Sequence, residues 1–388
     1  MRGNISQRDI PFIMLKDGML VRKQYIDALD EVSGDNSVVK VVTGMRGVGK
    51  TTIMSQYAET CVSRRNVTVL DYDFDTVACF DLKTAEDVRT RILKDCDGAG
   101  KSVIILHEVQ KISGWAPVVA ELVNLNVGEF FITASDNSVM NLRSLEGMNE
   151  KVQELRVTPL ALSEFMELNN FRSPRSALES YLKIGGLPAV RANMPLDVAY
   201  NLLDGMLCKA ILNDVLSYNG SLPPVASLAM ARHIMMESGV TLDADTVSEG
   251  SGASFRTSSK ILSAMAGCYM IFENEGRSFF NKLMRSKIVY YAADIGLRNC
   301  VKGYKAEKTN LGENAVIIEL KRLGYSVKIE GIGSDRSFEA TDDEGSMTYV
   351  VTPGPVTEKC TAKKTVITMD ENDVGGYTLS SFLSDTVE

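Results

Sequence analysis

The sequence predicts an α/β protein whose first domain is built on a mostly parallel sheet. Apolar stretches at 38–43, 67–73, 103–106 and 128–134 alternate with helical stretches, which is the pattern of parallel strands joined by crossover helices. A glycine-rich turn joins the first of these strands to a helix. At 388 residues the chain is also too long for one ordinary core, so we expect two or three domains.

Composition argues against several protein classes. Hydrophobic residues make up 45% of the chain and charged residues 24%, as in a soluble globular protein. The sequence has no long apolar run, and it starts MRGNISQRDI, without a basic-then-apolar leader. We therefore expect no membrane span, no membrane partner and a cytoplasmic location. The net charge of −8 argues against a wholly basic surface for nucleic acid and leaves a local basic face open.

Cysteine and histidine usage predicts reduced thiols and no histidine-based metal centre. The seven cysteines are odd in number and spread along the chain without a CxxC pair, which favours buried free thiols over disulfides or a zinc site. The two histidines, His107 and His233, lie far apart in the sequence.

Residues 38–60 contain a phosphate-binding pattern. They read VVKVVTGMRGVGKTTIMSQYAET, and the turn fits G-x-x-x-x-G-K-[ST], a P-loop, between a strand and a helix. Glycines let successive N–H groups point at phosphate oxygens, and the helix N-terminus adds its positive dipole end. Lys50 is expected on the β- and γ-phosphates, and the Thr51 hydroxyl on Mg²⁺. The expected nucleotide-binding residues of the loop are Gly44, Met45, Arg46, Gly47, Val48, Gly49, Lys50, Thr51 and Thr52.

Polar residues follow two later strands at the same edge of the sheet. SVIILHEVQ ends its strand on His107 and Glu108, and the strand in GEFFITASDNS runs into Ser135. Ligands bind at the carboxyl ends of parallel strands, so we expect Thr51, Glu108 and Ser135 to meet around the γ-phosphate. In nucleotide-hydrolysing P-loop proteins an aspartate that helps to hold Mg²⁺ stands where this chain has His107.

Seven further segments carry a family resemblance in chain order. They are IILHEVQKISGWAPVV, ITASDNS, PLALSEF, YLKIGGLP, YYAADIGLRN, LGENAVIIELKRLGYSVKI and KKTVITMD. Together they resemble a large group of prokaryotic AAA-type P-loop ATPases that carry a carboxyl-terminal domain of unknown function. The resemblance covers nearly the whole chain. It implies ATP as the ligand, Mg²⁺ as its cofactor, and Glu108 as the residue that orients or activates the attacking water.

Three positions depart from the family pattern. The Walker B aspartate is His107, the family's Gly-Arg after the fourth strand appears as Gly147-Met148, and MTYVVT in the carboxyl-terminal domain has neither acid nor lysine. An arginine that neutralises transition-state charge raises rates by roughly 10³ to 10⁵ in related phosphoryl transfer. Arg143 and Lys151 lie close enough in sequence to replace it. We expect ATP binding with slow or absent hydrolysis.

Two interpretations of His107 stay open. In the first, the imidazole replaces the oxygen ligand that Mg²⁺ prefers, and metal binding is weakened. In the second, His107 is only a polar residue at a strand end, and Mg²⁺ is held by Thr51, water and another carboxylate such as Asp71 or Asp73.

The middle of the chain predicts helices and then a second, smaller module. Residues 160–235 read as helices punctuated by glycine and proline, with MARHIMMES as a core face. From 240 to 285, two short helices, YMIFEN, a turn and a further strand resemble the winged helix-turn-helix of the family, with SSKILSAM as recognition helix. Duplex DNA and a protein are both open as its partner. The charged residues at 254–287 are Arg256, Lys260, Arg277, Lys282, Arg285, Lys287, Glu273 and Glu275.

Residues 304–388 combine a helix with four predicted strands. In the family this domain resembles restriction-endonuclease-like folds, whose active form needs a helix glutamate, a strand aspartate and a Glu/Gln-x-Lys. Glu313 fills the first position and Glu339 or Asp342 the second, but MTYVVT offers nothing for the third. We therefore expect a structural or partner-binding domain rather than a nuclease.

The sequence thus predicts four segments. They are a P-loop AAA-type ATP-binding domain at 1–160, a helical segment at 161–235, a winged helix-like domain at 236–290 and an inactive restriction-endonuclease-like domain at 291–388. The predicted function is an intracellular ATP-binding protein that uses nucleotide state to act on a partner. The alternative is a non-hydrolysing DNA-binding or regulatory scaffold in which the nucleotide is a structural ligand.

Overall fold

The chain forms two compact units in the computed structural model. The first unit runs to Met45 and resumes from Gly49 to Val157, whereas the second holds Arg46–Val48 and continues from Thr158. The division into four segments stays a prediction. The structure describes residues 19–98, 100–272, 288–304, 308–331, 336–343, 345–356, 360–361, 363–373 and 377–385.

The first unit contains a five-stranded sheet in which every neighbouring pair is parallel. The strand order is β2-β3-β4-β1-β5. The α/β fold with a parallel P-loop sheet is therefore confirmed. The strands are β1 (Val39–Thr43), β2 (Thr68–Asp73), β3 (Ser102–His107), β4 (Glu129–Ala134) and β5 (Val152–Arg156).

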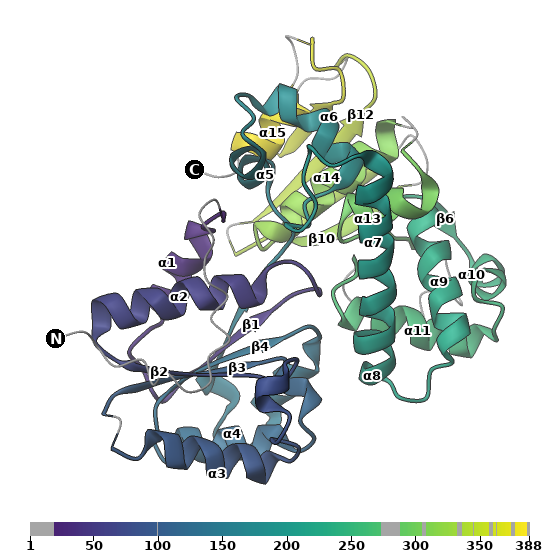
Figure 1. Ribbon diagram of the computed structural model, residues 1–388. Helices are drawn as coiled ribbons and strands as arrows, with labels where there is room; N and C mark the ends of the chain where they lie inside the picture. Colours follow the sequence, from purple (N-terminus) through teal and green to yellow (C-terminus); the bar gives the residue numbers. More distant parts are fainter. Residues whose placement is uncertain are drawn as a thin grey trace. The chain divides into compact units, whose positions relative to one another are not determined.

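Helices cover both faces of this sheet (Figure 1). Helix α2 (Lys50–Arg65) lies on one face with α1 (Lys23–Glu31) beside it, and α3 (Ala85–Cys96) and α4 (Trp115–Asn124) lie on the other. Short 3₁₀ turns lie between these elements. They are η1 (Val77–Cys79), η2 (Val109–Lys111), η3 (Asn137–Ser144) and η4 (Asn149–Lys151).

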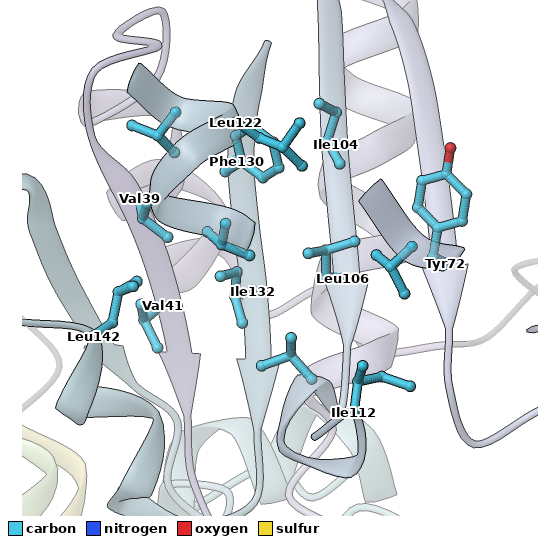
Figure 2. Packing of buried hydrophobic residues seen from close by; sticks show 14 of the residues in the cluster. Val39, Val41, Tyr72, Ile104, Leu106, Ile112, Leu122, Phe130, Ile132 and Leu142 are labelled. Carbon is cyan, nitrogen blue, oxygen red and sulfur yellow. The ribbon is translucent and has the colours of Figure 1, made fainter. Parts of the chain in front are cut away.

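Figure 2 shows the apolar strand residues that point into the buried core between the sheet and α3 and α4. Leu106 of β3 and Tyr72 of β2 belong to that core. Side chains alternate along a strand, so His107 of β3 and Asp71 and Asp73 of β2 lie on the face that α2 covers. The sheet therefore presents these three polar residues to the helix that follows the P-loop.

The second unit begins with helices at 160–235, as predicted. The buried Met230 and Met235 confirm that MARHIMMES contributes a core face. One turn of this region is a π-helix, η5 (Ile211–Val215), directly after α7. The helices are α5 (Leu162–Asn169), α6 (Pro174–Ile184), α7 (Leu196–Ala210), α8 (Leu216–Tyr218) and α9 (Pro224–Met236).

Short strands and two helices follow α9. Strand β6 pairs with β8 and β7 pairs with β9, both antiparallel. The elements are β6 (Thr241–Leu242), α10 (Ala244–Ser251), α11 (Phe255–Gly267), β7 (Ile271–Phe272), β8 (Ile288–Val289) and β9 (Tyr291–Ala292). The predicted turn after YMIFEN and the charged residues at 273–287 lie outside the described residues.

The unit ends with α13 (Ile295–Lys302), α14 (Lys308–Arg322) and a second five-stranded sheet. Its order is β10-β11-β12-β13-β14, with β10, β11 and β12 antiparallel and β12, β13 and β14 parallel. The predicted helix and four strands are present, and β14 and the last helix were not predicted. The bounds are β10 (Ser326–Glu330), β11 (Ser337–Thr341), β12 (Ser346–Thr352), β13 (Lys364–Thr368), β14 (Tyr377–Thr378) and α15 (Leu379–Asp385).

None of the helices in the described residues combines the length and the apolar character that a membrane crossing requires.

Candidate nucleotide-binding site

The loop between β1 and α2 has the backbone that its glycines predict. Gly44, Gly47 and Gly49 have φ values of 143°, 90° and 100°. Residues with a Cβ adopt such values at an energetic cost, so the glycines permit this turn. Gly49 is the N-cap of α2 and no side chain caps that end, so the positive end of the helix dipole lies at the loop.

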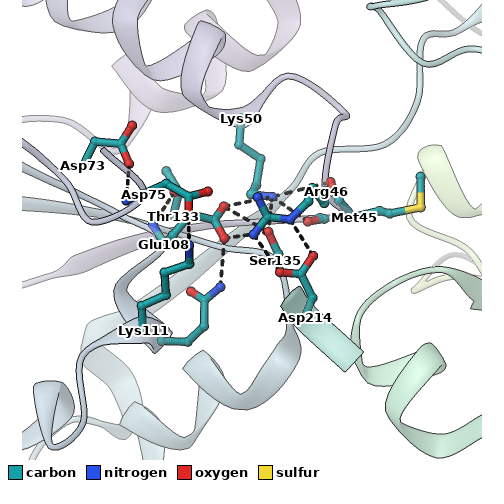
Figure 3. A network of polar contacts seen from close by, with 12 residues as sticks. Met45, Arg46, Lys50, Asp73, Asp75, Glu108, Lys111, Thr133, Ser135 and Asp214 are labelled. Atoms are coloured by element: carbon teal, nitrogen blue, oxygen red, sulfur yellow. Dashed lines mark hydrogen bonds and ion pairs between the residues drawn. The ribbon is translucent and has the colours of Figure 1, made fainter. Parts of the chain in front are cut away.

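The side chain of Lys50 folds back over the loop (Figure 3). Its Nζ donates to the carbonyl oxygen of Gly44 at 2.8 Å and to Oγ of Ser135 at 3.0 Å. The same Nζ lies 3.6 Å from Oε1 of Glu108. Lys50 is only 5% exposed. The P-loop lysine is thus held inside a polar cluster.

Glu108 lies directly after β3 with a left-handed backbone, φ 53° and ψ 45°. This conformation is unusual for a residue with a long side chain and is found mainly where function requires it. The N–H of Glu108 donates to Oγ1 of Thr133 at 3.1 Å. Its carboxylate accepts hydrogen bonds from Oγ of Ser135 at 2.8 and 2.9 Å and from Nε2 of Gln110 at 2.9 Å. Gln110 was not among the site residues predicted from the sequence.

His107 is 1% exposed and lies beside Asp71. Its Nε2 is 3.1 Å from Oδ1 of Asp71, but neither ring nitrogen forms a well-directed hydrogen bond within the described residues. Asp73 is the register partner of His107 on the neighbouring strand. Burial raises the pKa of Asp73, and His107 opposes that shift. The imidazole therefore lies among carboxylates in a buried position.

The first unit contains most of a segment that matches a known domain family. Residues 36–166 match the AAA domain family, and they carry the P-loop, the β3 strand end and Ser135. Residues 36–166 form an AAA domain. This match confirms the coarse part of the sequence prediction, an ATP-binding domain of the AAA type.

Two proteins are similar over much longer stretches than the AAA domain. An uncharacterised protein of Haemophilus influenzae is 24% identical over 336 residues, which span 82% of this chain and 83% of that protein. An uncharacterised protein of Methanocaldococcus jannaschii is 24% identical over 219 residues, 47% of this chain and 45% of that protein.

Solved structures with partial likeness include PCH-2 of C. elegans, at a TM-score of 0.30 and 9% identity, over 63% of this chain and 65% of that chain. The replication initiator DnaA, bound to AMPPCP and single-stranded DNA, aligns at a TM-score of 0.32 and 12% identity, over 63% of this chain and 85% of that chain.

The other P-loop residues differ from Lys50 in their burial and in their partners. Met45 and Val48 are buried, and Thr51 and Thr52 are partly exposed in the first turn of α2. Arg46 belongs to the second unit together with Gly47 and Val48, and there it donates from Nε and Nη2 to the buried Asp214, at 2.7 Å each. Arg46 therefore already has a carboxylate partner.

Met148, the second departure from the family pattern, lies in the core. Met148 is fully buried in the cluster between the sheet and α3 and α4. Arg143 donates to the carbonyl oxygen of Val152 at 3.1 Å, and Lys151 donates to Oδ1 of Asn124 at 3.0 Å. Both cations thus have partners away from the Lys50, Glu108 and Ser135 cluster.

The predicted nuclease positions do not form a ligand set. Oε2 of Glu313 accepts from Nη1 of Arg336 at 2.7 Å and from the hydroxyl of Tyr291 at 2.5 Å, and all three residues are buried. Glu339 lies on β11 with its side chain 38% exposed, 3.7 Å from Lys328. Within the described residues, no group of three or more His, Cys, Asp or Glu is arranged to hold a metal. Glu313 has a cationic partner where a nuclease would need a metal ligand.

Proposed function

We propose that this AAA-type protein binds ATP through residues 44–52 and hydrolyses it slowly with Mg²⁺. One observation carries the proposal: Lys50, Glu108 and Ser135 form a single hydrogen-bonded and charged cluster beside the P-loop, while the strand before Glu108 ends on His107 rather than on a carboxylate.

The residues fit the triphosphate. Glycine backbone at three loop positions and the uncapped first turn of α2 supply N–H groups, and Lys50 supplies a cation. These groups would bind the β- and γ-phosphates. Lys50 would then exchange its hydrogen bond to the Gly44 carbonyl for phosphate oxygens.

The residues fit Mg²⁺ only in part. Mg²⁺ bridges phosphate oxygens and neutralises charge that develops during phosphoryl transfer. Thr51 offers the oxygen ligand expected from α2, but the strand end offers an imidazole, and hard cations prefer oxygen. The carboxylate of Glu108 would orient water, with Ser135 and Gln110 fixing its direction. We expect slow turnover because Mg²⁺ would be bound weakly, although the proposed base Glu108 is present.

ATP binding and turnover test this proposal with three variants. Lys50→Ala should reduce ATP affinity at least about tenfold, because a charged hydrogen-bonding partner of the phosphates is lost. Glu108→Gln should abolish turnover and keep affinity. His107→Asp should raise the turnover with Mg²⁺. The exposed Lys94→Ala serves as the control for Lys50→Ala. Unchanged affinity of Lys50→Ala, or a wild-type turnover equal to that of His107→Asp, would contradict the proposal.

A second candidate function is DNA binding by the region from α9 to β9. Its element order, helix, strand, two helices and further short strands, supports a winged helix. On α11, Arg256, Lys260 and Ser263 are exposed at helical spacing, whereas Ser258 and Ser259 of the predicted recognition helix are buried. The exposed residues would form a basic face that contacts phosphates.

Salt-dependent DNA binding tests the second candidate. The double variant Arg256→Ala, Lys260→Ala should weaken binding to duplex DNA and lower the slope of log affinity against log salt by about 2. The double variant Lys83→Ala, Lys94→Ala removes two exposed lysines from the AAA domain and should leave the slope unchanged. Absence of wild-type binding at low salt would remove this candidate.

We also propose a structural or partner-binding role for the carboxyl-terminal domain. The buried ion pair of Glu313 and Arg336 supports it, because this carboxylate already has its charge balanced. Incubation with duplex DNA and divalent metal should give no cleavage. Cleavage that is lost in Glu313→Gln would refute this role.

A further inference from the structure

His107 has the properties of a metal ligand. It is the last residue of β3, on the sheet face that α2 covers, and it is 1% exposed. Nδ1 has no hydrogen-bonding partner within the described residues, and the contact of Nε2 is with Asp71, without hydrogen-bond geometry. A buried imidazole nitrogen normally has a hydrogen-bonding partner or a metal, so the environment of Nδ1 would accommodate a ligand.

The neighbouring carboxylate is placed as in histidine metal sites. Oδ1 of Asp71 lies 3.1 Å from Nε2 of His107. Histidines that bind metals are commonly oriented by a carboxylate next to one ring nitrogen, while the other nitrogen faces the metal. Asp71 can therefore orient the ring through one nitrogen and leave the other to a ligand.

The charges nearby favour a cation. Asp71, Asp73 and Glu108 are close to His107 in the sheet or in sequence. Lys50 pairs with Glu108 and Lys111 pairs with Asp75, whereas Asp71 and Asp73 lie on the strand beside His107. A divalent ion would balance this cluster of carboxylates.

The donor set differs from the one that Mg²⁺ prefers. Imidazole suits the borderline first-row transition ions, and affinity for a nitrogen site rises from Mn²⁺ to Co²⁺ and beyond. We propose that His107 makes the nucleotide site selective for ATP complexes of a first-row transition ion, such as Co²⁺ or Mn²⁺, over the Mg²⁺ complex. The inference rests on the proposed ATP binding.

The nucleotide has to complete this metal site. Within the part of the chain that the structure describes, no three acidic, histidine or cysteine side chains form a metal cluster. His107 and the Thr51 hydroxyl would supply protein ligands and the phosphates would supply the rest. Metal binding at His107 therefore depends on bound ATP.

Nucleotide affinity gives the first test. A fluorescent, non-hydrolysable ATP analogue is titrated into the full chain, free of any polyhistidine tag, with Mg²⁺, Mn²⁺ or Co²⁺. The wild type should bind the Co²⁺ complex about tenfold more tightly than the Mg²⁺ complex. In His107→Asp this ratio should fall toward one or below. Equal ratios in the two proteins overturn the inference.

Nitrogen coordination gives a readout that is independent of activity. Pulsed EPR of the Mn²⁺ complex with the analogue should show coupling to ¹⁴N of imidazole. The chain has only two histidines, so His233→Gln is the matched control. Coupling should persist in His233→Gln, vanish in His107→Asp, and be absent when the analogue is omitted. Coupling that survives in His107→Asp, or its absence from the wild type, overturns the inference.

The two proposals fail in different ways. Loss of analogue binding with all three metals would overturn ATP binding and the metal inference together. Analogue binding that is equal with Mg²⁺ and Co²⁺ and shows no ¹⁴N coupling would overturn only the role of His107. Thermal unfolding of each variant shows whether its fold is retained.

Discussion

Nε2 of Gln110 donates a hydrogen bond of 2.9 Å to Oε2 of Glu108, two residues before it. Ser135 donates to the same carboxylate from β4's end. The two donors come from different loops, so together they fix the direction of the carboxylate. The position of the proposed base thus depends in part on Gln110, which lies outside the P-loop.

Replacing Gln110 by leucine should lower turnover without weakening ATP binding. The carboxylate of Glu108 would keep its charge and lose the orienting donor Gln110, and misplacement of a catalytic group costs about 10- to 100-fold in rate. Single-turnover hydrolysis and analogue affinity measure the two effects separately. A loss of affinity as large as the loss of rate would show that Gln110 acts on the fold of the loop instead.

Glu108 also allows a test of backbone strain. Its φ of 53° is unfavourable for any residue with a Cβ, so Glu108→Gly should be more stable than Glu108→Ala by about 1 kcal/mol. Both variants lack the carboxylate, and they differ only in the methyl group. Urea unfolding of the two proteins measures the difference. Greater stability of the alanine variant would mean that this backbone is relaxed in solution.

The buried pair of Glu313 and Arg336 should be sensitive to removal of one partner. Their side chains are 4% exposed each, so Arg336→Met leaves a buried, unpaired carboxylate and should cost about 3–5 kcal/mol. The exposed pair of Lys328 and Glu330 provides the control, since Lys328→Met should cost at most about 1 kcal/mol. Urea unfolding at neutral pH measures both. Equal effects at the two sites would contradict the buried character of the first.

Asp294 should make stability depend on pH. Burial raises its pKa to about 6 from 3.8, although its side chain accepts hydrogen bonds from the N–H groups of Gly186 and Leu297. A raised pKa means that the folded state favours the neutral acid. Its contribution to stability is complete below about pH 4 and is lost as the pH rises through about 6.

Comparison with Asp294→Asn isolates this effect. Between pH 5 and pH 8 the wild type should lose about 1 kcal/mol of unfolding free energy relative to the variant, which has no ionisable group there. Unfolding curves of both proteins at the two pH values measure it. A wild type that gains stability over the variant in this range would show that the pKa is lowered.

Much of the fold could be predicted because local patterns agree with it. The P-loop pattern, together with the four apolar strands of the AAA domain, was sufficient for the parallel sheet. Strand β5 was missed because only Val152 of VQELR is buried, so the strand has no apolar run or clear alternation. The strand β14 has two residues, too few for any pattern.

Residues of the site that belong to sequence motifs could be predicted. Contacts that depend on the pairing of neighbouring strands could not. Lys50, Glu108 and Ser135 were named from their motifs, and the structure brings their side chains together. The proximity of Asp71 and His107 depends on the register between β2 and β3, which the sequence does not contain. Asp71 was considered as a ligand of Mg²⁺ rather than as a neighbour of the imidazole. Gln110 could have been noticed as the amide two residues after the expected base.

The folded-back Lys50 has a kinetic consequence. Its ammonium group already bonds to the Gly44 carbonyl and to Ser135, so a nucleotide arriving at the loop meets a lysine that is engaged elsewhere. Loading would then take place in two stages, a fast encounter and a slower rearrangement of the lysine. In stopped-flow experiments the observed rate of loading should level off at high ATP concentration, and the plateau would report how quickly the loop releases its own lysine.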